Sequence, residues 1–216
     1  MKKFLSIAAC SALLFAAPIA AVPRDANGPS ASEWSIGPII RGRNYSLGMP
    51  QTMQERDDNP TFVFPGPRVQ NGHVHYVTTP VRSLNGARGM TLRYRVEADR
   101  GVRFIPQEQP QEQATLSLYF QRGGDRWTVK TPHHRWYSPH NRLMPLTPGV
   151  HRLNISFDEP WIAMTGGNNR ELPGQFAAAL RDADNVGFVF GSSSARGHGV
   201  YATGGARFTV LDFEIY

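Results

Sequence analysis

The chain has 216 residues, a formal net charge of +6, a hydrophobic content of 40% and a single cysteine, Cys10. This length suits one domain plus a removable leader, and such a domain buries enough apolar surface to fold without disulfides. The basic residues are interspersed with acidic ones instead of being gathered on one face, which argues against a nucleic-acid partner.

The first 21 residues have the order of a bacterial secretory signal peptide. Two lysines precede an apolar run at residues 4–15, and small residues follow up to Ala21. The run is too short for a membrane span, so we expect cleavage after Ala21 and export to the periplasm or the extracellular space. Lipidation at Cys10 is the alternative, but few apolar residues precede that cysteine.

Residues 22–32 are rich in Pro, Gly, Ser and Ala without periodicity, which predicts a flexible linker. A single folded domain is expected over residues 33–216. Its first half is predicted to contain short strands around the Gly42 turn and a polar, exposed segment at residues 53–59. The predicted strands are residues 34–40, 45–49, 62–64 and 73–79.

Three central strands alternate apolar and polar residues. Their apolar sets are Leu92, Tyr94 and Val96, then Leu116, Leu118 and Phe120, then Leu153, Ile155 and Phe157. Because neighbouring side chains of a strand point to opposite faces, each strand is expected to have one core face and one solvated face. This pattern is typical of antiparallel sheets.

The C-terminal part contains the one helical pattern, at residues 175–183, where Phe176, Ala179, Leu180 and Ala183 recur at helical spacing. An apolar strand is predicted at residues 186–190, followed by a glycine-rich loop and a final alternating strand that ends at Tyr216. Many short strands and a single helix predict an all-β fold, an antiparallel two-sheet sandwich.

The order of elements resembles the galactose-binding-domain-like jelly rolls, which include many carbohydrate-binding modules. The resemblance includes a tryptophan turn at Trp161 and is strongest over residues 176–216, from the helix through NVGFVF and the glycine-rich loop to ARFTVLDFEIY. It implies a jelly-roll sandwich and often a lectin-like role, although such folds also serve as enzymes and scaffolds. The same resemblance leaves a structural calcium open, with Asp212 or Glu214 as candidates, although no Asp-rich loop is present.

Residues 126–142 supply the chemistry that sugar recognition needs, which is flat apolar rings and fixed polar groups. The solvated faces of the predicted strands would extend this surface if the strands are neighbours. The opposite interpretation is that the two tryptophans belong to the core and the arginines cover them. The predicted ligand-binding residues are Trp127, Trp136, Tyr137, Arg135, His134, Arg93, Arg95, Tyr119 and Gln121.

The histidines give a weaker indication of a functional site than residues 126–142 do. His73 and His75 are two apart on a predicted strand and are expected to share a face, but no spacing selects a third ligand, so no metal site is predicted. His198 lies between glycines, where it either reaches a ligand or closes the loop by bonding a backbone carbonyl.

We therefore predict a secreted, non-catalytic glycan-binding protein whose partner is a carbohydrate polymer or oligosaccharide. The alternative is a lyase on an acidic glycan, in which an arginine neutralises the uronate and a His or Tyr moves the proton. Its candidates would come from Arg93, Arg95, His73, His75 and Tyr119. A hydrolase is disfavoured because the solvated faces offer no pair of carboxylates.

Overall fold

The computed structural model describes residues 28–67 and 72–216. The predicted signal peptide, its cleavage site, Cys10 and the first residues of the predicted linker lie outside the described residues. In the described part of the chain, no helix has the length and apolar character needed to cross a membrane.

Two antiparallel sheets make up most of the described fold, which confirms the all-β prediction. The seven-stranded sheet has the order β1 (Ser35–Gly37), β6 (Tyr76–Pro80), β14 (Ala183–Gly191), β9 (Thr115–Arg122), β10 (Arg135–Tyr137) and β13 (Ile162–Ala163), with β11 (Met144–Pro145) also paired to β9. The five-stranded sheet has the order β12 (Gly149–Ser156), β7 (Gly89–Ala98), β16 (Ala206–Ile215), β5 (Asn59–Val63) and β4 (Gln54–Arg56).

Smaller elements decorate these sheets. The two-stranded ribbons are β2 (Ile39–Ile40) with β3 (Arg43–Asn44), and β8 (Phe104–Pro106) with β15 (Val200–Ala202). The described helices are α1 (Pro173–Arg181) and two 3-10 turns, Ala31–Glu33 and His140–Arg142.

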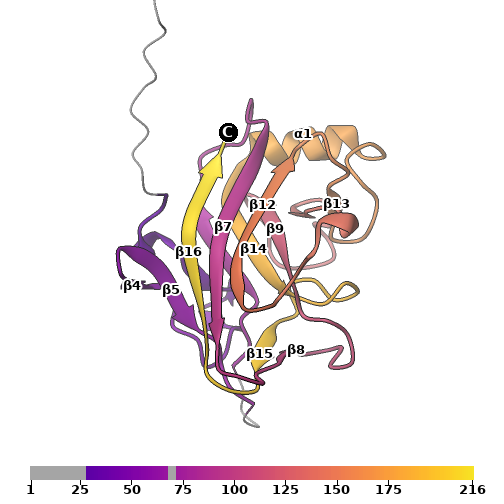
Figure 1. The fold of residues 1–216 in the computed structure, drawn as a ribbon. Helices are drawn as coiled ribbons and strands as arrows, with labels where there is room; N and C mark the ends of the chain where they lie inside the picture. The colour runs from indigo at the N-terminus through magenta and orange to yellow at the C-terminus, as the bar shows by residue number, and fades with distance from the viewer. Residues whose placement is uncertain (1–27, 68–71) are drawn as a thin grey trace, which may run out of the picture.

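The apolar faces of the two large sheets pack against each other. Figure 1 shows β12, β7 and β16 as one layer in front of β9 and β14. Aromatic rings join the layers: the ring centroid of Phe208 on β16 lies 5.1 Å from that of Phe188 on β14, and Phe213 lies 5.2 Å from Trp34. Burial of these rings is the main source of the fold's stability, since the described residues contain no cysteine to crosslink them.

The predicted alternation holds for β7, where Leu92 and Tyr94 are buried and Arg93 and Arg95 are exposed. The prediction of a solvated face on β9 is wrong, because Ser117, Tyr119 and Gln121 are also buried, with exposed fractions of 2%, 0% and 7%. β9 lies inside the sheet between β14 and β10, and its outer face is covered by a second apolar cluster. That cluster consists of Tyr76, Tyr119, Tyr137 and Val189, with Trp127 and Met164 packed on it.

The single α-helix is found close to where it was predicted. α1 begins with Pro173 in its first turn, where the missing N–H of proline costs no hydrogen bond. Phe176 fixes the helix to the core, with its ring centroid 4.9 Å from Trp136 and 5.6 Å from Phe120. Ala183 lies in β14 and not in the helix, because the helix ends at Arg181.

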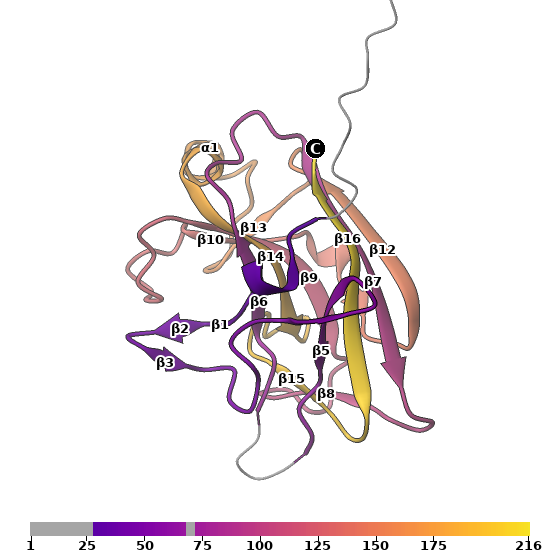
Figure 2. The same cartoon turned by 90° about the vertical axis from the view of Figure 1, so that its left-hand side faces the viewer.

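The N-terminal residues differ from the prediction in two ways. Residues 28–32, assigned by sequence to the linker, are part of the fold, since Ala31 is buried and the Trp34 indole donates a 3.1 Å hydrogen bond to the Pro29 carbonyl. No strand forms over residues 45–49, because the chain pairs earlier, across the Gly42 turn. The resulting β2–β3 hairpin projects from the outer side of the seven-stranded sheet, as Figure 2 shows.

Candidate functional site

The predicted ligand-binding residues do not form one surface. Arg93 and Arg95 are exposed on the outer face of the five-stranded sheet, whereas Tyr119, Gln121 and Tyr137 belong to the seven-stranded sheet. The packed core lies between the two sets. The expectation of one continuous polar surface is therefore wrong, because β7 and β9 are in different sheets.

Trp136 is a core residue with no exposed surface. Its ring packs on Phe176, and its indole N–H donates a 2.8 Å hydrogen bond to the His133 carbonyl. The ring therefore offers no open face on which a ligand could stack. The alternation along β10 instead directs Tyr137 to the outer side of the sheet.

The loop between β9 and β10 is fixed by a buried ion pair. Arg135 Nε lies 2.9 Å from Asp125 Oδ2, and the two side chains are only 9% and 0% exposed. The Asp125 carboxylate also accepts hydrogen bonds from the Gln121 amide at 2.9 Å, the Thr131 hydroxyl at 2.7 Å and the Trp127 backbone N–H at 3.0 Å. These bonds hold Trp127 at a φ of 57°, a conformation that non-glycine residues rarely adopt.

Above β9 the same loop covers three tyrosines. The hydroxyls of Tyr76 and Tyr137 lie 2.8 Å apart, and the Tyr119 ring centroid lies 4.9 Å from that of Tyr76. Burial raises the pKa of all three hydroxyls, so they stay protonated at neutral pH. Tyr119 is fully buried and therefore supports the site from beneath without facing a ligand.

The candidate site is a hollow of about 590 Å³ on this outer side, which we call the hairpin hollow. Five separate stretches of chain meet around it, and Trp127 and Arg135 bring the predicted segment into it. Its lining consists of Pro38, Ile40, Tyr45, Leu47, His73, His75, Tyr76, Gln107, Glu108, Trp127, Arg135, Gly197 and His198.

Exposed apolar side chains gather on the two loops beside the hairpin hollow. Ile39, Tyr45 and Leu47 of the hairpin region are 47%, 44% and 47% exposed, and Val129 on the loop that carries Trp127 is 79% exposed. Contiguous exposed apolar surface marks interaction sites, whereas single exposed apolar side chains are ordinary surface. The sequence placed Tyr45 and Leu47 in a predicted short strand at residues 45–49, so they were not predicted as site residues.

The histidines form the polar wall of the hollow. The rings of His73 and His75 lie on the same side, 6.2 Å apart, as their spacing predicted. Burial lowers the pKa of His75 to about 4, so its imidazole is neutral at pH 7. His75 Nδ1 lies 3.0 Å from the His73 carbonyl, which only accepts, so the proton is on Nδ1. The imidazole also hydrogen-bonds the Gln107 side chain.

His198 does not close its loop through a backbone carbonyl. Its Nδ1 lies 2.8 Å from Glu108 Oε1, and both side chains are about half exposed. The pair therefore presents a polar group at the rim of the hairpin hollow. Neither Gln107 nor Glu108 belonged to the predicted set, because nothing in a polar segment indicates which loop it will meet.

Another predicted residue, His134, is partly buried behind the loop and outside the lining of the hollow. Burial and the neighbouring Arg122 lower the pKa of its imidazole. Its backbone helps to hold the loop, since its N–H donates a 3.2 Å hydrogen bond to the Thr131 carbonyl and its carbonyl accepts one of 2.7 Å from the Arg122 N–H.

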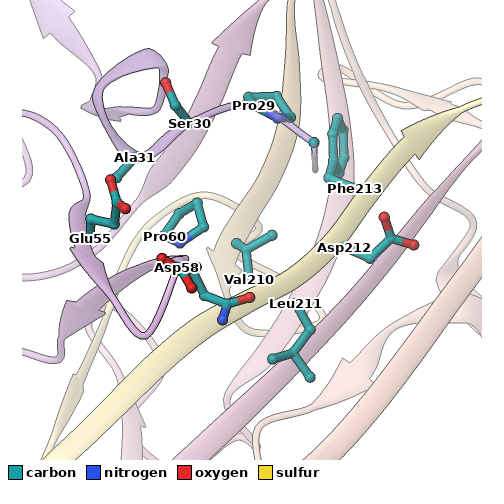
Figure 3. A pocket seen from close by; sticks show the side chains of 12 residues that line it. Pro29, Ser30, Ala31, Glu55, Asp58, Pro60, Val210, Leu211, Asp212 and Phe213 are labelled. Carbon is teal, nitrogen blue, oxygen red and sulfur yellow. The ribbon is translucent and has the colours of Figure 1, made fainter. Parts of the chain in front are cut away.

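A second hollow, of about 380 Å³, lies where the N-terminal residues cross β16 (Figure 3). Glu55, Asp58 and Asp212 border it, and its one ring, Phe213, is 6% exposed. It offers no open ring for stacking. Within residues 28–67 and 72–216 no group of three or more His, Cys, Asp or Glu side chains is arranged to hold a metal ion, and this includes the region of Asp212.

No family model matches the chain, and comparisons with curated proteins and with solved structures return no match. The fold and the hollow thus define the protein only as an all-β, antiparallel protein with a ring-lined and histidine-lined site outside its seven-stranded sheet.

Proposed function

We propose that the protein is a non-catalytic glycan-binding protein and that the hairpin hollow is its site. The observation that carries the proposal is the meeting of rings and fixed polar groups in one open hollow: Tyr45 and Trp127 with His75, Gln107 and Glu108. Sugar rings have apolar faces and hydroxyl edges, so they need this combination.

The rigidity of the wall supports binding. Trp127 is held by its backbone bond to Asp125, by a ring contact to Tyr76 at 4.9 Å and by the Arg135 guanidinium, 5.3 Å from its ring centroid. A ring that is already ordered loses little conformational entropy when a ligand stacks on it. Tyr45 is the more open ring, with the Arg43 guanidinium 5.2 Å from its centroid.

A lyase on an acidic glycan is the competing function, and the neutral imidazole of His75 in the hollow is the observation that favours it. The other groups that a lyase needs, a free arginine and an ionisable tyrosine, are poorly supplied in the hollow. Arg135, the arginine in the described lining, is already paired with Asp125, and the nearby tyrosine hydroxyls stay protonated because burial raises their pKa. Arg93 and Arg95 lie on the other sheet.

The proposal also covers the fold class and the cellular location of the protein. We infer a jelly roll of the galactose-binding-domain-like class from the order of elements over residues 176–216, and export from the charged, apolar and small-residue order of the leader. Both follow from the sequence, and both agree with a role in binding polymers outside the cytoplasm.

The test is a glycan array probed with the wild-type protein and with Tyr45→Ala. Tyr45 is 44% exposed and outside the core, so its loss is expected to leave the fold intact and to weaken binding about tenfold, equivalent to about 1.4 kcal/mol. Tyr216→Ala, which removes a ring outside the lining of the hollow, just after the end of β16, is the control and is expected to keep wild-type binding.

Absence of binding across the array, or binding that Tyr45→Ala leaves unchanged, would reject the hollow as a glycan site. Release of unsaturated, ultraviolet-absorbing products from an acidic polysaccharide, lost in His75→Gln, would instead establish the lyase.

A further inference from the structure

A smaller hollow of about 250 Å³ adjoins the hairpin hollow on the same outer face. Pro38, Tyr76 and Trp127 line both, so the two hollows adjoin at these three side chains. The smaller hollow, which we call the Asp184 hollow, is completed by polar groups from β9, β14 and the loop after β9. A ligand that fills both must therefore be longer than a single sugar.

The charges that line the two hollows are mostly cancelled or absent at neutral pH. The Arg135 and Asp125 charges form the buried ion pair. The His75 imidazole is neutral because burial lowers its pKa to about 4. The exposed cations of the β9–β10 loop, Arg126 and Lys130, are outside the described lining of both hollows.

Asp184 remains as an exposed carboxylate in the smaller hollow. Its Oδ1 accepts a 2.8 Å hydrogen bond from the Asn185 amide, which leaves the charge in place. No salt bridge to Asp184 is found among the described residues, and the Arg122 guanidinium on the neighbouring strand is bound to Asp182 at 2.8 Å. At the opposite end, the Glu108 carboxylate lies at the rim beside His198.

Asp184 is therefore the lining carboxylate that no described salt bridge pairs, since Glu108 is paired with His198 and Asp125 with Arg135. The described lining of the two hollows includes no free guanidinium or ammonium group. This is unexpected for a chain with a net charge of +6, and it opposes a polyanionic ligand such as a uronate or sulfated polymer. From this charge pattern we propose that the two hollows form one extended site for an oligosaccharide that bears amino groups and no acidic groups. The inference rests on the proposed glycan-binding function and specifies its ligand class.

The test compares three hexasaccharides by isothermal titration at about pH 6 and low salt: glucosamine, N-acetylglucosamine and galacturonate oligomers. The first two share a backbone and differ in charge. The glucosamine oligomer is expected to bind about threefold to fivefold more tightly than the N-acetylated one, because a single partly exposed carboxylate contributes modestly. The galacturonate oligomer is expected to bind more weakly than either.

Asp184→Asn is expected to remove most of the preference for glucosamine and to leave affinity for the N-acetylated oligomer within twofold. Asp57→Asn is the matched control, since Asp57 is exposed in the β4–β5 turn of the other sheet and its φ of 50° suits asparagine. It is expected to preserve the preference.

The outcomes separate the two proposals. Tight binding of the N-acetylated oligomer that depends on Tyr45, with no gain for glucosamine or with a preference for galacturonate, overturns the ligand class and keeps the site. A preference that survives Asp184→Asn also overturns it. Failure of all three oligomers, together with a blank array, overturns the glycan-binding function itself.

Discussion

The Arg135 guanidinium lies against the Trp127 ring, 5.3 Å from its centroid, while its Nε lies 2.9 Å from Asp125. The Nε–H is not aligned for a hydrogen bond to that carboxylate, so the contact is an ion pair. A second guanidinium nitrogen donates a 3.0 Å hydrogen bond to the Thr128 carbonyl. One arginine thus joins the sheet to the loop that lines the candidate site.

Asp125→Asn is expected to destabilise the protein by about 3 to 5 kcal/mol, because it leaves the buried Arg135 charge without its partner. Urea unfolding measures this difference. Asp57→Asn alters the exposed pair with Arg56, whose side chains are 56% and 88% exposed, and is expected to cost less than about 1 kcal/mol. Equal effects of the two substitutions would contradict a buried pair.

Trp136→Ala is expected to lower the free energy of unfolding by about 3 to 5 kcal/mol, because the ring is fully buried between β10 and α1. Tyr45→Ala, which removes an exposed ring, is expected to cost less than about 1 kcal/mol. Denaturant titrations of both variants measure these two changes in the free energy of unfolding. A Trp136→Ala protein as stable as the wild type would show that the ring is outside the core.

His75 makes stability depend on pH. Its pKa is about 4 in the folded protein against 6.5 when unfolded, so the unfolded chain binds more protons between these values. The stabilising contribution is complete above pH 6.5 and is lost as the pH falls towards 4, by up to about 3 kcal/mol. His75→Gln is expected to flatten this part of the stability profile, as measured by unfolding at a series of pH values. Identical wild-type and variant profiles would count against a neutral, buried His75.

Two glycines give opposite expectations for the same substitution. Gly187 in β14 has a φ of 153°, and a Cβ there would lie 2.1 Å from the Val77 carbonyl oxygen, so Gly187→Ala is expected to destabilise by more than about 1 kcal/mol. Gly174 in the first turn of α1 has open space around it, so Gly174→Ala is expected to stabilise by about 0.4 to 1 kcal/mol. Melting temperatures that shift in the same direction for both variants would contradict the crowded surroundings of Gly187 or the open space around Gly174.

The amino-acid sequence by itself determined the fold class and many of the elements. The period-2 pattern of Leu92, Tyr94 and Val96 and the helical spacing of Phe176 and Ala179 are local signals, because each depends on which side of one element is apolar. The turn at Gly42 and the final strand to Ile215 were predictable for the same reason.

Only the tertiary structure decided which sheet each strand joined and what covered its second face. Tyr119 has a polar end and lies on a face that alternation marks as solvated, yet it is buried because the loop carrying Trp127 folds over β9. Trp127 and Trp136 look equivalent in sequence, but one lines the hollow and the other lies in the core. The site brings together Tyr45, His75, Glu108 and Trp127 from distant parts of the chain. Sheet pairing and loop packing place these residues side by side, so no local sequence pattern could predict that they share a site.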